Sequence, residues 1–199
     1  MDNKLRKSLG ISNTMLMYVG NLETYQGIDL LLESFALALQ ENAQADLVII
    51  GGAAKDIAKY KRQAQNLNIS ARVHFLGPKP VKHLAMYLAQ ADILVSPRIT
   101  GKNTPMKLYS YLDSGKALLA TDLPTHTQVL NSHIAMLAQP NPEAFSQGML
   151  KVLTDQELRS KLGSAGKQLI QQKHTYQVFC QQLNKIYDGL QGELVQRAA

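Results

Sequence analysis

Several features that mark secreted and membrane proteins are missing from this sequence of 199 residues. No stretch approaches the roughly 20 consecutive apolar residues that a membrane-spanning helix requires. The first residues, MDNKLRK, contain no apolar segment and therefore do not resemble a signal peptide. The single cysteine, Cys180, excludes an internal disulfide and is typical of a chain kept in a reducing compartment. These absences predict a cytoplasmic location.

The signatures of several enzyme classes are absent as well. The sequence contains no GxGxxG dinucleotide fingerprint, no GxxxxGK[ST] phosphate loop and no GxSxG nucleophile elbow. It has no CxxC or HExxH pattern, and its five histidines show no metal-ligand spacing. We therefore expect no nicotinamide or flavin cofactor and no bound metal, and neither a nucleoside triphosphatase nor a hydrolase is favoured.

The charge balance favours an anionic partner without naming it. The formal net charge is +6, but no block of five or more basic residues occurs. No basic run carries the interleaved aromatic residues on which nucleic-acid bases would stack. Nucleic acid is therefore not an expected partner, and a phosphate-bearing substrate or an acidic membrane surface remains.

Strand and helix signals alternate along the chain, which predicts parallel strands joined by right-handed crossovers. Short apolar runs predict strands at 15–19, 47–50, 73–77, 93–95, 118–121 and 134–137. Helical periodicity predicts helices at 28–39, 55–67, 81–90, 143–153, 155–173 and 175–190. The predicted fold class is α/β: one Rossmann-like, doubly wound parallel sheet of about six strands with extra C-terminal helices.

The predicted organisation has a single domain. Residues 1–13 are expected to form an N-terminal linker, 14–190 the Rossmann-like domain and 191–199 a flexible tail. Gly163 and Gly166 fall inside the predicted helix 155–173, which is expected to bend or break there because glycine weakens a helix.

The strongest local candidate for a site is the segment 103–115. Thr104 suits the N-cap of a helix, Pro105 its first turn and Gly115 its end. The N-terminus of such a helix is a ready anion site, and Lys107 in the first turn opposes the helix dipole unless an anion binds. The alternative is a well-capped helix with a solvated Lys107.

Taken together, several segments resemble the C-terminal domain of family 4 type retaining glycosyltransferases, which have the two-Rossmann-domain GT-B fold. Residues 18–35 (YVGNLETYQGIDLLLESF) are similar to the family's opening YVGRLxxxKGIDLLLEAF. Residues 47–52 resemble LVIVGxG, 73–77 resemble VxFLG and 91–97 resemble ADxxVxPS. Residues 105–122 are similar to PxKLFEYMAxGKPVVATD, so the resemblance runs from about Thr14 to Tyr187 in order.

The resemblance implies one half of a GT-B glycosyltransferase that moves a sugar from a nucleoside diphosphate sugar, a UDP-sugar or GDP-sugar, to an acceptor with retention. It implies no metal. The catalytic residues would lie largely in an acceptor-binding N-terminal domain missing from this chain, so the chain alone would have little or no hexosyltransferase activity. The full enzyme would be cytoplasmic, with peripheral association at the inner face of a membrane. The implied diphosphate-binding residues are Gly20, Asn21, Gln26, Arg98, Lys102, Thr104, Pro105, Met106 and Lys107, and the base and ribose residues are Gly77, Pro78, Val81 and Ser110.

The sequence departs from this family at charged positions. Asn21 and Gln26 stand where the family has Arg and Lys, and Lys102 and Ser110 stand where it often has glutamates. The two amides keep hydrogen-bond donors but remove positive charge from a diphosphate site. Arg98 and Lys102 are hypothesised to restore that charge.

Other interpretations remain open. The departures favour a degenerate, non-catalytic nucleotide-sugar-binding or interaction module, and a nucleotide-sugar epimerase fragment with the GT-B fold is a further alternative. His126 follows the fifth predicted strand, on the expected ligand side, but its Pro-Thr-His-Thr context favours a turn residue in solvent.

Overall fold

The structure, a computed structural model, describes residues 4–41 and 44–198. Its centre is one parallel sheet of six strands in the order β3-β2-β1-β4-β5-β6. This arrangement is the doubly wound order, and it confirms the predicted fold class. The strands are β1 (Thr14–Val19), β2 (Ala45–Ile50), β3 (Val73–Gly77), β4 (Ile93–Ser96), β5 (Ala117–Thr121) and β6 (Met136–Ala138).

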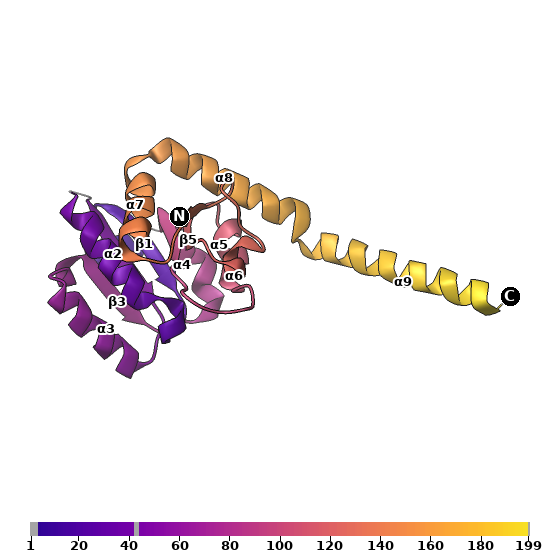
Figure 1. The fold of residues 1–199 in the computed structure, drawn as a ribbon, viewed down its shortest axis with the longest axis horizontal. Coiled ribbons are helices and arrows are strands. Elements are labelled where there is room, and N and C mark those ends of the chain that lie inside the picture. Colours follow the sequence, from indigo (N-terminus) through magenta and orange to yellow (C-terminus); the bar gives the residue numbers. More distant parts are fainter. Residues whose placement is uncertain (1–3, 42–43, 199) are drawn as a thin grey trace.

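Helices cover both faces of this sheet (Figure 1). On one face lie α2 (Ile28–Gln40), α3 (Ala54–Asn66) and α7 (Pro142–Thr154), and on the other lie α4 (Leu84–Leu88) and α5 (Lys107–Asp113). The remaining helices are α1 (Lys4–Leu9), α6 (Pro124–Thr127), α8 (Gln156–Lys173) and α9 (Tyr176–Ala198), with single 3-10 turns η1 (Thr24–Gln26), η2 (Ser70–Arg72) and η3 (Val81–His83).

The side chains of the strands alternate between two halves of the core, one on each face of the sheet. In β1, Leu16 and Tyr18 point to the cluster that includes α2 and α7, whereas Met15 and Met17 point to the cluster that includes α5. Successive strand side chains point to opposite faces, so a strand buried on both sides needs an unbroken apolar run. All residues of β2 are buried for this reason, including Asp46 at its start.

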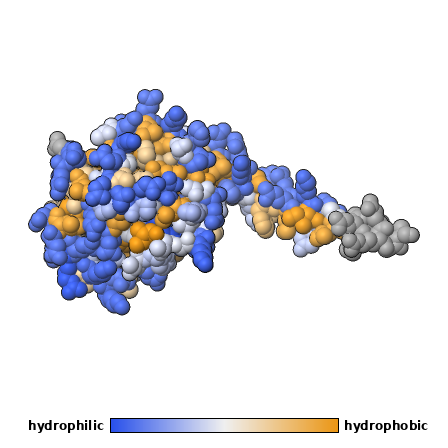
Figure 2. Space-filling model, viewed as in Figure 1, coloured by the Kyte–Doolittle hydropathy of each residue, from blue (hydrophilic) through white to orange (hydrophobic). Residues whose placement is uncertain are grey.

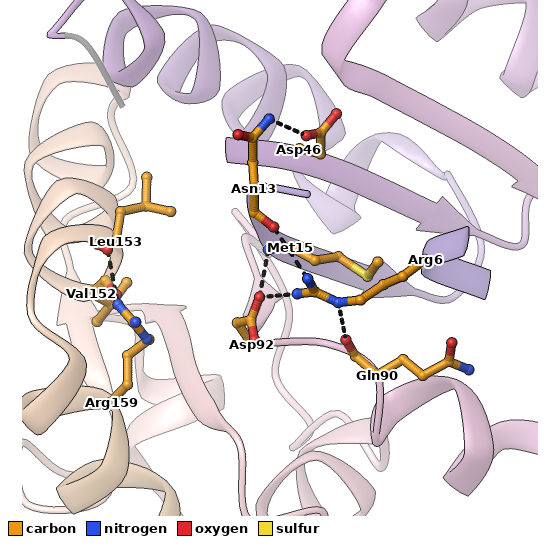
Figure 3. A network of polar contacts seen from close by, with 9 residues as sticks. All are labelled: Arg6, Asn13, Met15, Asp46, Gln90, Asp92, Val152, Leu153 and Arg159. Atoms are coloured by element: carbon orange, nitrogen blue, oxygen red, sulfur yellow. Dashed lines mark hydrogen bonds and ion pairs between the residues drawn. The ribbon is translucent and has the colours of Figure 1, made fainter. Parts of the chain in front are cut away.

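Helix α1 lies in the segment that was expected to be a linker, and no helix was predicted there. The Arg6 guanidinium contacts the Asp92 carboxylate and donates to the carbonyl oxygens of Gln90 and Asn13 (Figure 3). The Leu5 amide also donates to the Gln90 side chain, over 2.9 Å. These contacts join α1 to the amino-terminal edge of the sheet, opposite the edge where ligands of such folds bind.

The prediction that α8 bends or breaks is wrong. The helix runs without interruption from Gln156 to Lys173 because its glycines serve close packing. A Cβ on Gly163 would overlap the backbone carbonyl of Gly115, and one on Gly166 would come within 2.8 Å of the Leu112 side chain. The predicted helix 81–90 is also shorter than expected, because its first turn is the 3-10 turn η3.

The last helix, α9, extends away from the body of the molecule (Figure 1). It continues through Ala198, within the segment expected to be a tail. Among the helices of the described residues, none combines the length and the apolar character needed to cross a membrane.

Candidate functional site

The two loops that leave the sheet at its switch point touch each other. β1 and β4 are neighbours in the sheet, but the chain continues from β1 to α2 on one face and from β4 towards α5 on the other. The amide of Ile99 donates to the carbonyl of Tyr25 over 3.0 Å. Gly27 has a left-handed φ of 73°, and a Cβ there would overlap the carbonyl of Pro97. In α/β sheets, ligands bind beside the loops at the carboxyl ends of the strands around this switch point.

Lys107 reaches from the first turn of α5 to the end of β1. Its Nζ donates to the Tyr18 hydroxyl and to Gln26 Oε1, each over 3.0 Å, and lies 4.2 Å from the centre of the Tyr18 ring. Burial, helped by the nearby positive charge of Arg98, lowers the pKa of Lys107 to about 7. The alternative of a solvated Lys107 side chain is therefore wrong. Both oxygen partners of this amine are neutral, so an anion would complete its environment.

The end of β1 is fixed by the hydroxyl groups of two tyrosines, Tyr18 and Tyr111. The Tyr111 hydroxyl accepts a hydrogen bond from the Val19 amide at 2.8 Å, and the Tyr18 hydroxyl donates to the Asn21 carbonyl at 2.6 Å. Burial raises the pKa of both hydroxyls, so they remain neutral donors and acceptors. Directly above them, a Cβ on Gly20 would lie 2.9 Å from Lys107 Nζ.

The two amides of the first loop are placed differently. Gln26 is buried and accepts from Lys107, whereas Asn21 is exposed and donates through Nδ2 to the Tyr25 hydroxyl over 3.4 Å. The Gly20 amide is taken up by the sheet, since it donates to the Ile50 carbonyl over 3.0 Å. Gly20, Gln26 and Lys107, three of the residues named from the resemblance, lie close together in the structure.

Arg98 organises the loop after β4. Its guanidinium donates to the carbonyls of Thr100 and Asn103, over 2.7 and 3.0 Å, and to Asn103 Oδ1 over 3.1 Å. It also stacks 5.1 Å from the centre of the Tyr25 ring and is buried. A Cβ on Gly101 would overlap the guanidinium, which shows how closely the loop wraps it. Arg98 is therefore a buried positive charge enclosed by the loop after β4.

The prediction that Thr104 caps α5 is wrong. The helix begins at Lys107, its N-cap position is the exposed Met106, and the Thr104 hydroxyl donates instead to Gln128 Oε1 over 2.8 Å. Residues 103–105 are held in a loop because the Asn103 carbonyl accepts from both Arg98 and Thr125. With Pro105 buried in that loop, α5 has only seven residues and its N-terminus is no anion site by itself.

The prediction that His126 is a turn residue in solvent is wrong, because its side chain is buried. Its Nδ1 lies 2.9 Å from the Thr121 carbonyl, its Nε2 lies 2.9 Å from the Ser96 hydroxyl, and the Thr121 hydroxyl donates to the Arg98 carbonyl. A neutral imidazole satisfies this arrangement by donating from Nδ1 and accepting at Nε2. Burial is the main reason that the pKa of His126 is lowered to about 4. His126 therefore ties the ends of β4 and β5 to the loop that contains Arg98.

Residues implied by the resemblance line two cavities. One, of about 430 Å³, lies over the ends of β1, β2 and β3, and the other, of about 390 Å³, lies between α4 and α5. The residues implied for base and ribose divide between them, with Pro78 at the first and Val81 and Ser110 at the second. Gly77 stays in the sheet, where its carbonyl accepts from the Gly51 amide. Lys102 lies on the exposed loop beside this region.

Acidic and histidine side chains do not converge at this site. Among residues 4–41 and 44–198, no group of three or more His, Cys, Asp or Glu residues is placed to hold a metal ion. His74 pairs instead with Asp46, at 2.9 Å.

Comparison with known proteins gives a consistent family. The family model described as glycosyl transferases group 1 matches residues 1–169. A phosphatidyl-myo-inositol mannosyltransferase of Mycobacterium tuberculosis is 24% identical over 176 residues, which cover 85% of this chain and 45% of that protein. A D-inositol 3-phosphate glycosyltransferase of Corynebacterium diphtheriae is 30% identical over 99 residues, or 46% of this chain and 23% of that protein.

Solved structures agree on the fold. HepE of Anabaena in complex with UDP has a TM-score of 0.83 at 17% identity, covering 94% of this chain and 52% of that chain. The C-terminal domain of a glycosyl transferase group 1 family protein from Francisella tularensis has a TM-score of 0.75 at 15% identity, covering 87% of this chain and 93% of that domain. The chain spans less than half the length of the curated relatives that it matches.

Proposed function

This chain belongs to the glycosyl transferases group 1 family, and we propose that it is the donor-binding half of a retaining glycosyltransferase. Its ligand is a nucleoside diphosphate sugar, with a uridine or guanosine base. An N-terminal domain outside this chain binds the acceptor and supplies most catalytic groups. The Anabaena neighbour solved with UDP and with UDP-glucose supports this class of ligand.

The observation that carries the proposal is the environment of Lys107. Its amine sits at the carboxyl edge of β1, between two neutral oxygen atoms, with a pKa lowered to about 7. A buried amine held by neutral partners gains most from an anion, and a diphosphate supplies that anion. Gly20, which has no side chain to block the approach, lies directly beside Nζ.

The missing loop cation leaves Lys107 as the amine at this place. The family pattern that the sequence resembles has lysines at both position 26 and position 107, and here Lys107 Nζ lies 3.0 Å from Gln26 Oε1. Positive charge at this place therefore comes from α5 alone and not also from the loop. Gln26 orients the amine, and Arg98 adds positive potential from the loop after β4, as its lowering effect on the pKa of Lys107 indicates.

The chemistry that this arrangement favours is stabilisation of a departing diphosphate. When the bond from the anomeric carbon to the β-phosphate breaks, negative charge grows on the phosphate oxygens. A preorganised cation in a site from which water is excluded stabilises that charge more than water would. The acceptor that receives the sugar binds to the domain outside this chain, so the isolated chain binds donor but turns it over poorly.

Calorimetric titration of the 199-residue chain with UDP, GDP and ADP at low salt tests the proposal. We expect saturable binding of one of these nucleotides and a loss of about tenfold in affinity for Lys107→Met, because a hydrogen bond to a charged group is removed. Lys161→Met, an exposed lysine on α8, serves as the control and keeps wild-type affinity.

Two results would contradict the proposal. No binding of any of the three nucleotides at millimolar concentration would favour the degenerate module. Equal affinity of Lys107→Met and the wild-type chain would remove Lys107 from the diphosphate site.

A further inference from the structure

The hydroxyl group of Tyr18 connects the loop after β1 to the amine of Lys107. The side chain of Tyr18 is fully buried, and its hydroxyl donates to the Asn21 carbonyl over 2.6 Å. A hydroxyl has one proton and two lone pairs, so only lone pairs remain for a second partner. Lys107 Nζ donates to the hydroxyl over 3.0 Å. The Asn21 carbonyl therefore fixes the hydroxyl as an acceptor for Lys107.

The amine of Lys107 has one N–H left for a ligand. A charged lysine amine has three donors. One is taken by the Tyr18 hydroxyl and a second by Gln26 Oε1, each over 3.0 Å. Among the described residues, Nζ makes no further hydrogen bond or ion pair. Two fixed acceptors therefore determine the direction of the third N–H, on a site where Gly20 has no side chain.

The charged groups around this amine oppose its positive charge. Arg98, from the loop after β4, lowers the pKa of Lys107 together with burial. His126 of α6 also senses Lys107, but its pKa of about 4 keeps the imidazole neutral at pH 7. Burial raises the pKa of Tyr18, so its hydroxyl stays neutral as well. Because a hydrogen bond to the charged form of a group favours that form, the Tyr18 hydroxyl counteracts burial and Arg98.

We propose that Tyr18 is a positioning residue for the donor diphosphate, whose hydroxyl aims the third N–H of Lys107 at a phosphate oxygen. The proposal rests on the donor-binding function above and deepens it. In this role Tyr18 acts through Lys107 and needs no contact with the nucleotide. Removing its hydroxyl should therefore weaken binding only while the amine of Lys107 is present.

A double-mutant cycle tests this dependence by titration with UDP, GDP and ADP at pH 7. Tyr18→Phe keeps the ring and removes only the hydroxyl, and it is expected to lower affinity about fivefold, the size of one hydrogen bond. In the Lys107→Met background the same change should cost nothing further, since coupled residues are not additive. Tyr109→Phe is the control, because this partly buried tyrosine of α5 packs against His174 and should keep wild-type affinity.

A second measurement needs no nucleotide. Heteronuclear NMR of labelled lysine side chains follows the titration of Lys107 in the free chain. The pKa of Lys107 should be lower in Tyr18→Phe than in the wild-type chain, because the charged amine loses an acceptor, and unchanged in Tyr109→Phe. A purely structural role of Tyr18 would leave this pKa where it is. Thermal unfolding followed by circular dichroism checks that each variant keeps the fold.

The outcomes separate the two proposals. Equal losses of affinity in the wild-type and Lys107→Met backgrounds, or an unchanged pKa of Lys107 in Tyr18→Phe, would overturn the role of Tyr18 while donor binding stands. If the wild-type chain binds no nucleotide, the donor-binding function fails, and the positioning role fails with it.

Discussion

Some residues at the carboxyl edge of the sheet have strongly shifted pKa values, and Lys107 is the clearest example. Its pKa of about 7 means that a sizeable fraction of the free chains hold a neutral amine at neutral pH. A bound diphosphate favours the charged amine and raises that pKa again. Above pH 7, binding must therefore take up a proton, and affinity must fall as the pH rises.

This linkage can be measured with UDP-glucose or GDP-mannose, whose diphosphates do not titrate near neutrality. Between pH 7 and 8.5 we expect affinity to fall by up to tenfold per pH unit, and below pH 7 this group should add no pH dependence. Titrations in buffers of different ionisation enthalpy count the protons directly. Lys107→Met should bind more weakly and without proton uptake. Proton uptake that persists in this variant would assign it to another group.

His126 makes the stability of the fold depend on pH in the acidic range. The folded imidazole has a pKa of about 4, whereas an unfolded histidine has one near 6.5. Since the unfolded chain binds the extra proton between these values, the free energy of unfolding falls as the pH drops from about 6.5 to about 4. The loss attributable to His126 is on the order of 3 kcal/mol.

Urea unfolding at a series of pH values from 4 to 7 tests this expectation. His126→Gln should flatten the decline over that range, because the variant has no titrating group at this position. His133→Gln, at an exposed site, is the matched control and should leave the decline as it is in the wild-type chain. An unchanged decline in His126→Gln would show that other groups cause it.

At the scale of elements, apolar periodicity predicted the strands well but the ends of the helices and the loops between elements less well. An apolar run such as 47–50 has one low-energy solution in a sheet covered on both faces, and the observed β2 extends it by two residues. The beginning of α5 was mispredicted because Thr104 is bonded to Gln128, which is distant in sequence. Propensity for a cap is a local property, and a tertiary hydrogen bond overrides it.

The other misplaced elements have the same cause. Residues 4–9 form a helix in which Arg6 contacts Asp92. The two residues are far apart in the sequence, so no local pattern predicts this contact. Gly163 weakens a helix by propensity, yet it lets α8 approach the carbonyl of Gly115. Within the site, the sequence suggested Gly20, Gln26 and Lys107 through resemblance, but the burial of His126 depends on packing between elements.

The molecule as a whole consists of a packed α/β body and one projecting helix. Figure 2 shows hydrophobic side chains exposed along α9, and the exposed fractions are 82% for Tyr176, 56% for Phe179 and 60% for Ile186. These side chains remove little apolar surface from water, so they add little to the free energy of unfolding. The body, in contrast, buries both faces of its sheet.

A chain that ends after Thr175 should therefore keep the stability of the body. We expect its urea midpoint to match that of the full chain, because the two core clusters contain no residue of α9. The truncated chain should bind less of the dye ANS, since exposed apolar side chains such as Phe179 and Leu190 are removed with α9. As a control, Leu112→Ala, which opens a cavity in the core beneath α8, should lower the midpoint strongly, at a cost of about 2–5 kcal/mol. A drop of similar size in the truncated chain would mean that α9 packs on the body in solution.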